Sequence, residues 1–214
     1  RTPSIMRRFF SKYIWRFSFD TKEIYLTFDD GPTAEITEFV LDELKKYNAK
    51  ATFFCIGKNI KKHTNIFEKI LTEGHTIGNH TQQHLNGWKT KTDRYLNNIL
   101  ECEHTILTSL EKTREPKSKN KEPKLFRPPY GKIKYSQAKE LLKKGYRIIM
   151  WDVLSADFDR SISNEKCLQN VLKNTKNGSI IVFHDSTKAS KKLRFVLPKV
   201  LKEFSDKGFV FKKI

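Results

Sequence analysis

The sequence predicts one α/β domain built on a parallel sheet, and two observations lead to that fold class. The chain has 214 residues, which is enough for a single domain with a substantial core. Short apolar runs rich in β-branched and aromatic residues alternate with amphipathic helical patterns about seven times. This alternation is typical of right-handed β/α units whose strands pair in parallel, in an open doubly wound sheet or in a closed barrel. The chain has no Gly-rich nucleotide-binding motif, which favours the barrel.

The predicted elements follow one another in strand and helix order. Strands are expected at residues 23–28, 51–56, 75–79, 146–151 and 179–183, and the segments LFRPP at 125–129 and FVFKK at 209–213 complete the units. Helices are expected at 33–48, 59–72, 92–112, 134–144, 164–175 and 191–206. Pro32 and Thr33 suit the start of the first helix, and the polar segment 113–124 interrupts the pattern.

Positive charge is concentrated in three segments of the chain. The formal net charge is +18, and the segments 1–18, 113–124 and 186–214 hold most of the excess. No helix-turn-helix, zinc-finger or RNP-type pattern accompanies this charge, so nucleic acid is not the expected partner. We expect the basic flanks to attract an anionic cell wall or membrane surface. Nothing in the sequence sets the oligomeric state.

Residues 1–21 form a basic, aromatic segment ahead of a predicted domain at 22–214. The segment could lie on an anionic membrane as an amphipathic helix, or it could cap one end of the core. We favour the capping role, carried by Phe9, Phe10, Tyr13, Ile14 and Trp15. The chain shows no secretory leader and no run of about 18 apolar residues, so bacterial cell envelope and cytoplasm both stay open. The spacing of its three cysteines is not typical of a metal site or of a disulfide framework, so we expect buried thiols.

Polar residues with useful chemistry follow several of the predicted strands. In a parallel β/α barrel the catalytic groups lie at the carboxyl ends of the strands. Each of these residues alone would be an ordinary turn or surface residue, but together they predict a site. They are Asp29, Asp30, His80, His84, Arg127, Asp152, Asp157, His184 and Asp185.

His80 and His84 are spaced i and i+4, which predicts two imidazoles on one face of a helical turn, within reach of one metal ion. The segment lacks the Glu of the H-E-x-x-H motif, so a general base must come from elsewhere. The Asp29-Asp30 pair can supply both the third metal ligand and the general base. One carboxylate would complete a two-His, one-carboxylate ligand set, and its neighbour would act as the base.

Four segments resemble, in order, four of the five motifs of the polysaccharide deacetylases of carbohydrate esterase family 4, the NodB homology domain. These segments are TFDDGP at 27–32, HTQQH at 80–84, RPPYG at 127–131 and IVFHD at 181–185. The resemblance covers roughly residues 22–213. It implies a distorted (β/α)7 barrel, which agrees with the count of units above.

The resemblance also implies a role for each motif residue. Asp30, His80 and His84 would bind a divalent metal, most often zinc, with cobalt or nickel as alternatives. Asp29 would be the catalytic base, and Arg127 would hold it ionised and oriented. The backbone N–H of Tyr130 would help to stabilise the oxyanion, and His184 would protonate the departing amine.

The fourth motif departs from the family pattern W-x-V-D-x-x-D-W. Leu154 stands where the family has its first Asp, and Phe158 replaces the Trp. Asp157 is retained, and by the match it should pair with His184 and raise its pKa. The departures bear on the apolar wall of the pocket, where Val182 fills the apolar position of the fifth motif. Asp152 has the place of a structural partner, and Trp88 could line a sugar-binding cleft or belong to the core.

The expected function is metal-dependent removal of N-acetyl groups from polysaccharide containing N-acetylglucosamine, of the peptidoglycan or chitin type, with release of acetate. Two alternatives share much of this site. One is an O-acetyl esterase acting on a plant glycan such as xylan, and the other is a non-catalytic glycan-binding module that keeps the fold. Retention of base, Arg and acid together argues against the module, because binding alone needs no acid/base pair.

Overall fold

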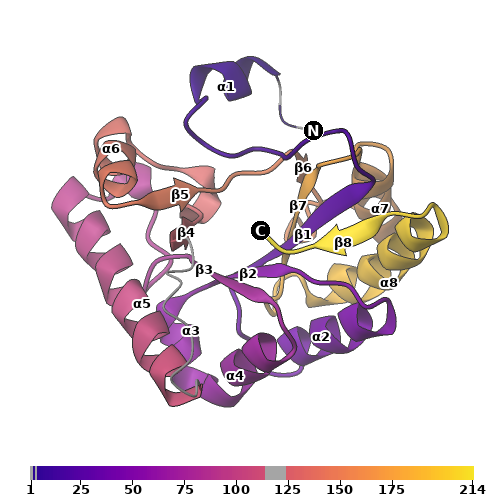
Figure 1. The fold of residues 1–214 in the computed structure, drawn as a ribbon, viewed down its shortest axis with the longest axis horizontal. Helices are drawn as coiled ribbons and strands as arrows, with labels where there is room; N and C mark the ends of the chain where they lie inside the picture. The colour runs from indigo at the N-terminus through magenta and orange to yellow at the C-terminus, as the bar shows by residue number, and fades with distance from the viewer. Residues whose placement is uncertain (1, 3, 114–123) are drawn as a thin grey trace.

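The computed structural model describes residues 2, 4–113 and 124–214 and contains one curved sheet of parallel strands (Figure 1). The strand order is β5-β4-β3-β2-β1-β7-β6, and β8 pairs with the start of β1. The strands are β1 Glu23–Asp29, β2 Thr52–Cys55, β3 Thr76–Asn79, β4 Lys124–Phe126, β5 Tyr146–Ile148, β6 Val153–Leu154, β7 Ile180–His184 and β8 Val210–Lys212.

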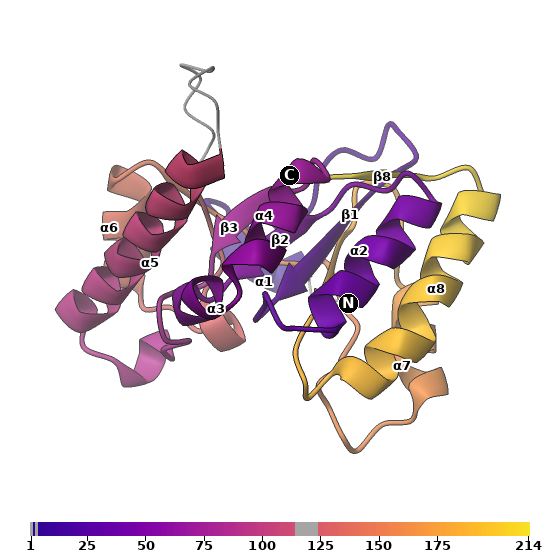
Figure 2. The same cartoon turned by 90° about the horizontal axis from the view of Figure 1, so that it is seen from below.

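Helices cover the outer side of this sheet, and the prediction of a distorted (β/α)7 barrel is confirmed (Figure 1). Figure 2 shows α2 and α8 lying side by side along one flank. The α-helices are α1 Ser4–Phe9, α2 Ile36–Lys46, α3 Gly57–Lys62, α4 Thr64–Thr72, α5 Thr92–Thr113, α6 Tyr135–Lys143, α7 Asn164–Leu172 and α8 Ser190–Asp206. Two short 3-10 helices, η1 Gly87–Lys89 and η2 Pro129–Gly131, lie in loops.

The apolar periodicity of α2 shows why the helices pack as they do. Ile36, Val40, Leu41 and Leu44 fall on one face of the helix and are buried in the main core. At the start of the helix the Glu38 carboxylate accepts a hydrogen bond from the Glu35 backbone N–H at 3.0 Å, which satisfies one of the donors that a helix leaves free.

The centre of the sheet is fixed by a row of three aromatic rings. Phe28 of β1 is in register with Phe53 of β2 and Phe183 of β7, and the ring centroids are 5.1 and 6.0 Å away. All three side chains are buried, so a shift of register would move them out of the core. The row fixes the next position as well, where Asp29 is in register with His184.

The N-terminal segment fills the space between the two edge strands of the sheet (Figure 1). Ile14 bridges Ile149 just after β5, and Arg16 bridges Ser179 just before β7. Trp15 is buried between them, which agrees with the expected capping role. The same expectation is wrong for Phe9 and Phe10, which are 78% and 44% exposed, because α1 ends at Phe9 and lies outside the sheet.

Other differences from the predicted elements are local. The helix expected at 59–72 is divided at His63, where φ is −129° and ψ is 53°, into α3 and α4. The apolar pattern continues across this residue and therefore does not reveal the break. The two-residue strand β6 is too short for any sequence pattern. Cys55, Cys102 and Cys167 are free and buried, as expected. Within the described residues, no helix has both the length and the apolar character needed to cross a membrane.

Candidate active site

Five of the nine residues predicted from strand ends, Asp29, Asp30, His80, His84 and His184, line one cleft of about 390 Å³ at the carboxyl ends of the strands. β1 and β7 bring Asp29 next to His184, while β3 and β4 lead directly into His80 and Arg127. The cleft is lined by Asp29, Asp30, His80, His84, Pro128, Tyr130, Gly131, Trp151, Leu154, Phe158, Val182, His184, Ser186 and Lys188.

The turn after β1 is held in an unusual conformation. Asp30 has φ 82°, in the left-handed region that residues with a side chain rarely adopt. Two hydrogen bonds hold the peptide group that follows it. The Asn59 side chain donates to the Asp30 carbonyl at 2.7 Å, and the Gly31 N–H donates to the Asp185 carboxylate at 3.0 Å.

Asp185 is the buried anchor of this turn. Besides the Gly31 N–H, its carboxylate accepts the Thr37 hydroxyl of α2 at 2.5 Å, and its own backbone N–H donates to the Asp29 carbonyl at 3.1 Å. Burial raises the pKa of Asp185 to about 7. The carboxyl group therefore ties β1, β7 and α2 together behind the cleft.

A methyl group at position 31 should disturb this anchor, because the Cβ of an alanine there would overlap the Asp185 carboxylate. We expect Gly31→Ala to lower the free energy of unfolding by about 1–3 kcal/mol, measured by urea denaturation. In an Asp185→Ala background the same substitution should cost less, since the overlapping group is gone. An equal cost in both backgrounds would contradict the steric explanation.

Asp30, His80 and His84 form a group whose ligand atoms lie within 4.8 Å of one another. The Asp30 Oδ1 atom is 3.7 Å from His80 Nε2 and 3.1 Å from His84 Nε2. This oxygen is buried and has no hydrogen bond of good geometry. Burial opposes the charge on Asp30, but the His84 contact and the neighbouring His80 and His184 outweigh it and lower the pKa of Asp30.

The protonation of His80 suits a metal ligand. Its Nδ1 lies 2.8 Å from the Arg127 carbonyl, and because a carbonyl only accepts, Nδ1 carries the proton and Nε2 is left as a lone-pair donor. Burial lowers the pKa of His80 to about 4, so the ring is neutral at neutral pH. His84 Nδ1 is likewise 3.1 Å from the Tyr130 hydroxyl. Two imidazole nitrogens and a carboxylate oxygen fit a divalent metal such as zinc.

The predicted helical turn at His80–His84 is wrong. The segment is a loop in which Thr81 and His84 have φ values of 65° and 56°, both left-handed. Asn79 Oδ1 accepts the Thr81 N–H at 2.8 Å, and the Thr81 hydroxyl accepts the Leu85 N–H at 3.2 Å. These side-chain hydrogen bonds compete with helical hydrogen bonds. The His80 and His84 rings are nevertheless close, with a centroid distance of 5.1 Å, although the segment is not helical.

Asp29 is held by a fully buried arginine. Arg127 Nη1 donates to Asp29 Oδ1 at 2.7 Å and to the Thr27 hydroxyl at 2.7 Å. Its Nε and Nη2 donate to the carbonyls of Ile149 and Met150 at 3.2 and 2.9 Å, so every edge of the guanidinium is engaged. The guanidinium balances the charge of the buried Asp29 carboxylate and fixes its orientation.

His184 lies on the other side of the cleft, paired with Asp157. The Asp157 carboxylate is 2.8 Å from His184 Nδ1 and accepts the His184 backbone N–H at 2.7 Å. Burial alone would lower the pKa of His184, but Asp157, with Asp29 and Asp30, raises it to about 9. The imidazole is therefore protonated at neutral pH.

Apolar side chains form the wall around these polar groups. Leu154 and Phe158, the two departures from the fourth motif, both line the cleft beside Val182. The Phe158 ring meets the His184 ring edge-on at a centroid distance of 5.0 Å. Tyr130, at φ 60° and 60% exposed, packs its ring against His84 on the opposite wall.

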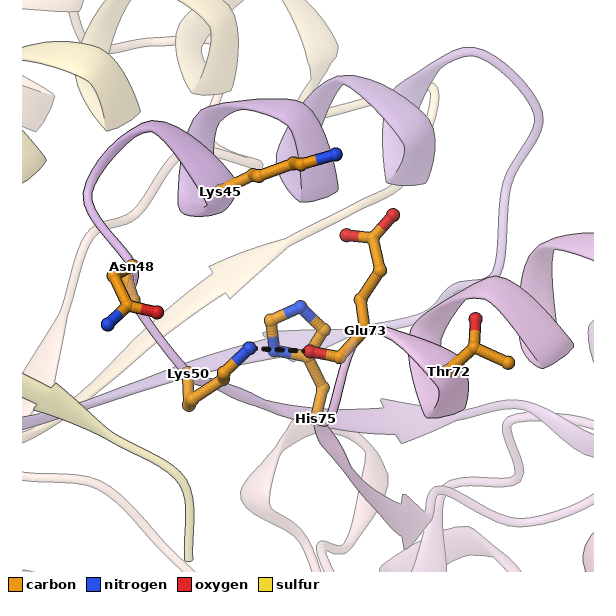
Figure 3. A pocket seen from close by; sticks show the side chains of 7 residues that line it. Lys45, Asn48, Lys50, Thr72, Glu73 and His75 are labelled. Carbon is orange, nitrogen blue, oxygen red and sulfur yellow. Dashed lines mark hydrogen bonds between the residues drawn. The ribbon is translucent and has the colours of Figure 1, made fainter.

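Two other polar residues, Asp152 and His75, lie outside the cleft. Asp152 is buried and accepts the Ser179 hydroxyl at 2.9 Å, away from the cleft. His75 lines a second cavity of about 240 Å³ ahead of β2 and β3, at the opposite end of the strands (Figure 3). His75 Nδ1 accepts the Ala51 N–H at 3.2 Å, and Lys50 donates to the Glu73 carbonyl at 2.7 Å. The His75 ring therefore has a local hydrogen-bond partner.

A family model described as polysaccharide deacetylase matches residues 18–149. The chain belongs to the polysaccharide deacetylase family. A peptidoglycan-N-acetylglucosamine deacetylase of Bacillus cereus is 41% identical over 177 residues, which are 82% of this chain and 61% of that protein. A second such deacetylase of Bacillus cereus is 33% identical over 198 residues, which are 92% of this chain and 88% of that protein.

Solved structures agree with this family membership. The crystal structure of the Bc1960 peptidoglycan N-acetylglucosamine deacetylase matches with a TM-score of 0.86 at 33% identity, covering 100% of this chain and 95% of that one. The family resemblance inferred from four motifs is therefore confirmed. This polysaccharide deacetylase chain spans less than two thirds of the length of the first Bacillus cereus relative.

Several residues that position the site have no role predicted from the sequence. Thr27 supports Arg127, Asn59 supports Asp30, and Thr37 supports Asp185. Thr27 lies in a strand and Thr37 in a helix, where a polar residue on a buried face is the available sequence signal. Asn59 lies at the start of α3, where neither its burial nor its partner follows from the sequence pattern.

Proposed function

We propose that this chain removes N-acetyl groups from N-acetylglucosamine-containing polysaccharide, of the peptidoglycan or chitin type, and releases acetate. The observation that supports this most is the meeting of three groups in one cleft: the Asp30, His80 and His84 set, the Asp29–Arg127 pair and the His184–Asp157 pair. Hydrolysis of an amide needs a Lewis acid that polarises the carbonyl, a general base that activates water and a general acid that protonates the amine. The three groups match these needs in that order.

Asp30, His80 and His84 would hold the metal, for which zinc is the first candidate and cobalt or nickel are alternatives. When bound there, the metal would supply Lewis-acid polarisation of the acetyl carbonyl. Asp29 takes a proton from the attacking water with the carboxylate oxygen that Arg127 does not occupy. Arg127 keeps this carboxylate in place throughout, because three other acceptors and an aromatic contact fix the guanidinium itself.

When water attacks the acetyl carbonyl, negative charge develops on the carbonyl oxygen. In η2 the N–H groups of Gly131 and Lys132 donate to the carbonyls of Pro128 and Pro129, at 2.9 and 3.1 Å. Among the hydrogen bonds of the described residues, none uses the Tyr130 N–H, so this donor is free for the oxyanion. His184, protonated at neutral pH, then gives its proton to the departing amine nitrogen.

The family relatives described above, named as peptidoglycan-N-acetylglucosamine deacetylases, support a cell-wall glycan as the substrate. The cleft agrees with an acetyl group, since Leu154, Phe158 and Val182 offer an apolar surface for its methyl. An O-acetyl esterase would use the same metal set, and only a comparison of substrates separates the two functions.

Acetate release from peptidoglycan, N-acetylglucosamine oligomers and acetylated xylan tests the proposal, each with and without a chelator. We expect release from the first two substrates, loss of at least 90% of it after chelation, and recovery on adding zinc. Release from xylan alone would favour the O-acetyl esterase. A rate that a chelator leaves unchanged, with metal shown to be absent, would rule out the metal-dependent chemistry.

A further inference from the structure

Trp88 is a large aromatic side chain that the chemistry above does not use. The sequence leaves open whether it belongs to the core or to a sugar-binding surface, and the structure places it on the surface, 60% exposed. Its ring does not project freely, however. The indole Nε1–H donates to the Ile133 carbonyl at 3.1 Å, so one edge of the ring is fixed while much of the ring surface remains in water.

The loop that carries Trp88 is joined firmly to the loop that carries Tyr130. An added Cβ at Gly87 would overlap the Lys132 carbonyl oxygen, so η1 and the chain after η2 are in close backbone contact. Gln137 donates to the Gly87 carbonyl at 2.9 Å, and Lys134 donates to the Thr90 carbonyl at 2.8 Å. Trp88 therefore has a fixed position relative to the wall of the cleft.

Trp88 is not among the residues that line the cleft, but two segments of the chain join it to the His84 and Tyr130 side of the cleft. His84 lines the cleft four residues before Trp88, and Tyr130 lines it three residues before Ile133, to which the indole is bonded. The Lys132 ammonium lies over the Trp88 ring, 5.2 Å from its centroid, which places a hydrogen-bond donor next to one face of the ring. An anchored aromatic face with a polar donor next to it suits a pyranose ring, which has an apolar C–H face and a hydroxyl rim.

We propose that Trp88 forms a separate subsite that stacks a neighbouring sugar of the glycan chain while another sugar occupies the metal cleft. This inference rests on the proposed function, because it assumes that the ligand is a polysaccharide. The subsite takes a neutral or anionic amino-sugar residue of the chain, and it makes the enzyme favour longer oligomers over short ones. Lys132 provides a donor to the polar substituents of the stacked ring.

Substrate length separates this role from a purely structural one. In Trp88→Ala we expect kcat/KM for an N-acetylglucosamine hexamer to fall about tenfold, mainly through KM, as is usual for truncation of a buried Trp contact. The kcat/KM for the dimer should stay within twofold of the wild-type value. Trp88→Phe loses the indole hydrogen bond but keeps the stacking face, and it should retain most of the activity on the hexamer. Phe9→Ala, which removes another exposed ring, is the matched control and should leave kcat/KM unchanged for both substrates.

Equal losses on dimer and hexamer, or no loss on the hexamer, would overturn the subsite. Calorimetric titration of the hexamer into the wild type and Trp88→Ala tests binding without turnover. If the wild type releases no acetate but binds the hexamer more tightly than Trp88→Ala does, the proposed deacetylation fails and the subsite stands. If both proteins bind the hexamer equally, the subsite fails whatever the activity.

Discussion

Asp29→Asn is expected to lower kcat for acetate release by about 10³-fold while metal binding is retained. Asparagine has nearly the same shape and can still accept the hydrogen bond that Arg127 Nη1 makes at 2.7 Å. It cannot take a proton from water, so the general base is lost. The ligand set of Asp30, His80 and His84 does not include the substituted side chain. Steady-state kinetics on an N-acetylglucosamine oligomer and zinc content by mass spectrometry measure the two effects.

The substitution also leaves the buried Arg127 without its counter-charge, and this requires a stability control. Removing one partner of a buried ion pair commonly costs about 3–5 kcal/mol. Arg127 retains its acceptors on Thr27, Ile149 and Met150, so we expect a less stable but folded protein. Circular dichroism at the assay temperature establishes that it is folded. Turnover near the wild-type rate by a folded, metal-loaded Asp29→Asn protein would exclude Asp29 as the base.

The sequence predicted which side chains meet because the motifs lie at the ends of strands. Once β1 and β7 are recognised as neighbouring parallel strands, the positions of Asp29 and His184 follow from the register, which Phe28 and Phe183 fix by burial. The carboxyl ends of parallel strands share one edge of the sheet, so the remaining motifs converge there.

The conformation of the loops could not be predicted in the same way. Asp30, Thr81, His84 and Tyr130 all have positive φ, although none is glycine. Such conformations are unfavourable locally and persist because contacts made after folding outweigh them, here the hydrogen bonds of Asp185, Asn59 and Asn79. Local sequence rules describe the unstrained preference, so they predicted a helical turn at His80–His84 where the structure has a loop.

The N-terminal segment shows a second limit of the sequence. Its basic and aromatic composition is compatible with a membrane surface and with a core, and composition does not distinguish them. The outcome depends on the gap between the edge strands β5 and β6, which the segment spans through the bridges of Ile14 and Arg16 while Trp15 packs into the core beside β4 and β5. A gap between edge strands is a property of the whole sheet, and no single segment encodes it.

Asp157→Asn is expected to lower activity at pH 8 by about 10²-fold and to move the basic limb of the pH–rate profile to lower pH. As the acid, His184 must be protonated, and its pKa of about 9 keeps it so up to that pH. Asp157 is the largest contributor that raises this pKa, opposing burial. When its charge is removed, burial prevails, the pKa falls, and the protonated fraction at pH 8 falls with it. Activity should therefore recover in part as the pH is lowered.

The direction of this shift distinguishes proton donation from simple positioning. Asp159→Asn removes a partly exposed carboxylate two residues away and should leave the basic limb unchanged, which makes it the matched control. A uniform loss of activity at every pH in Asp157→Asn would mean that Asp157 only orients the ring through its 2.8 Å contact with Nδ1. A shift of the basic limb to higher pH would contradict the acid role, because removing a negative charge beside an imidazolium can only make it release its proton more readily.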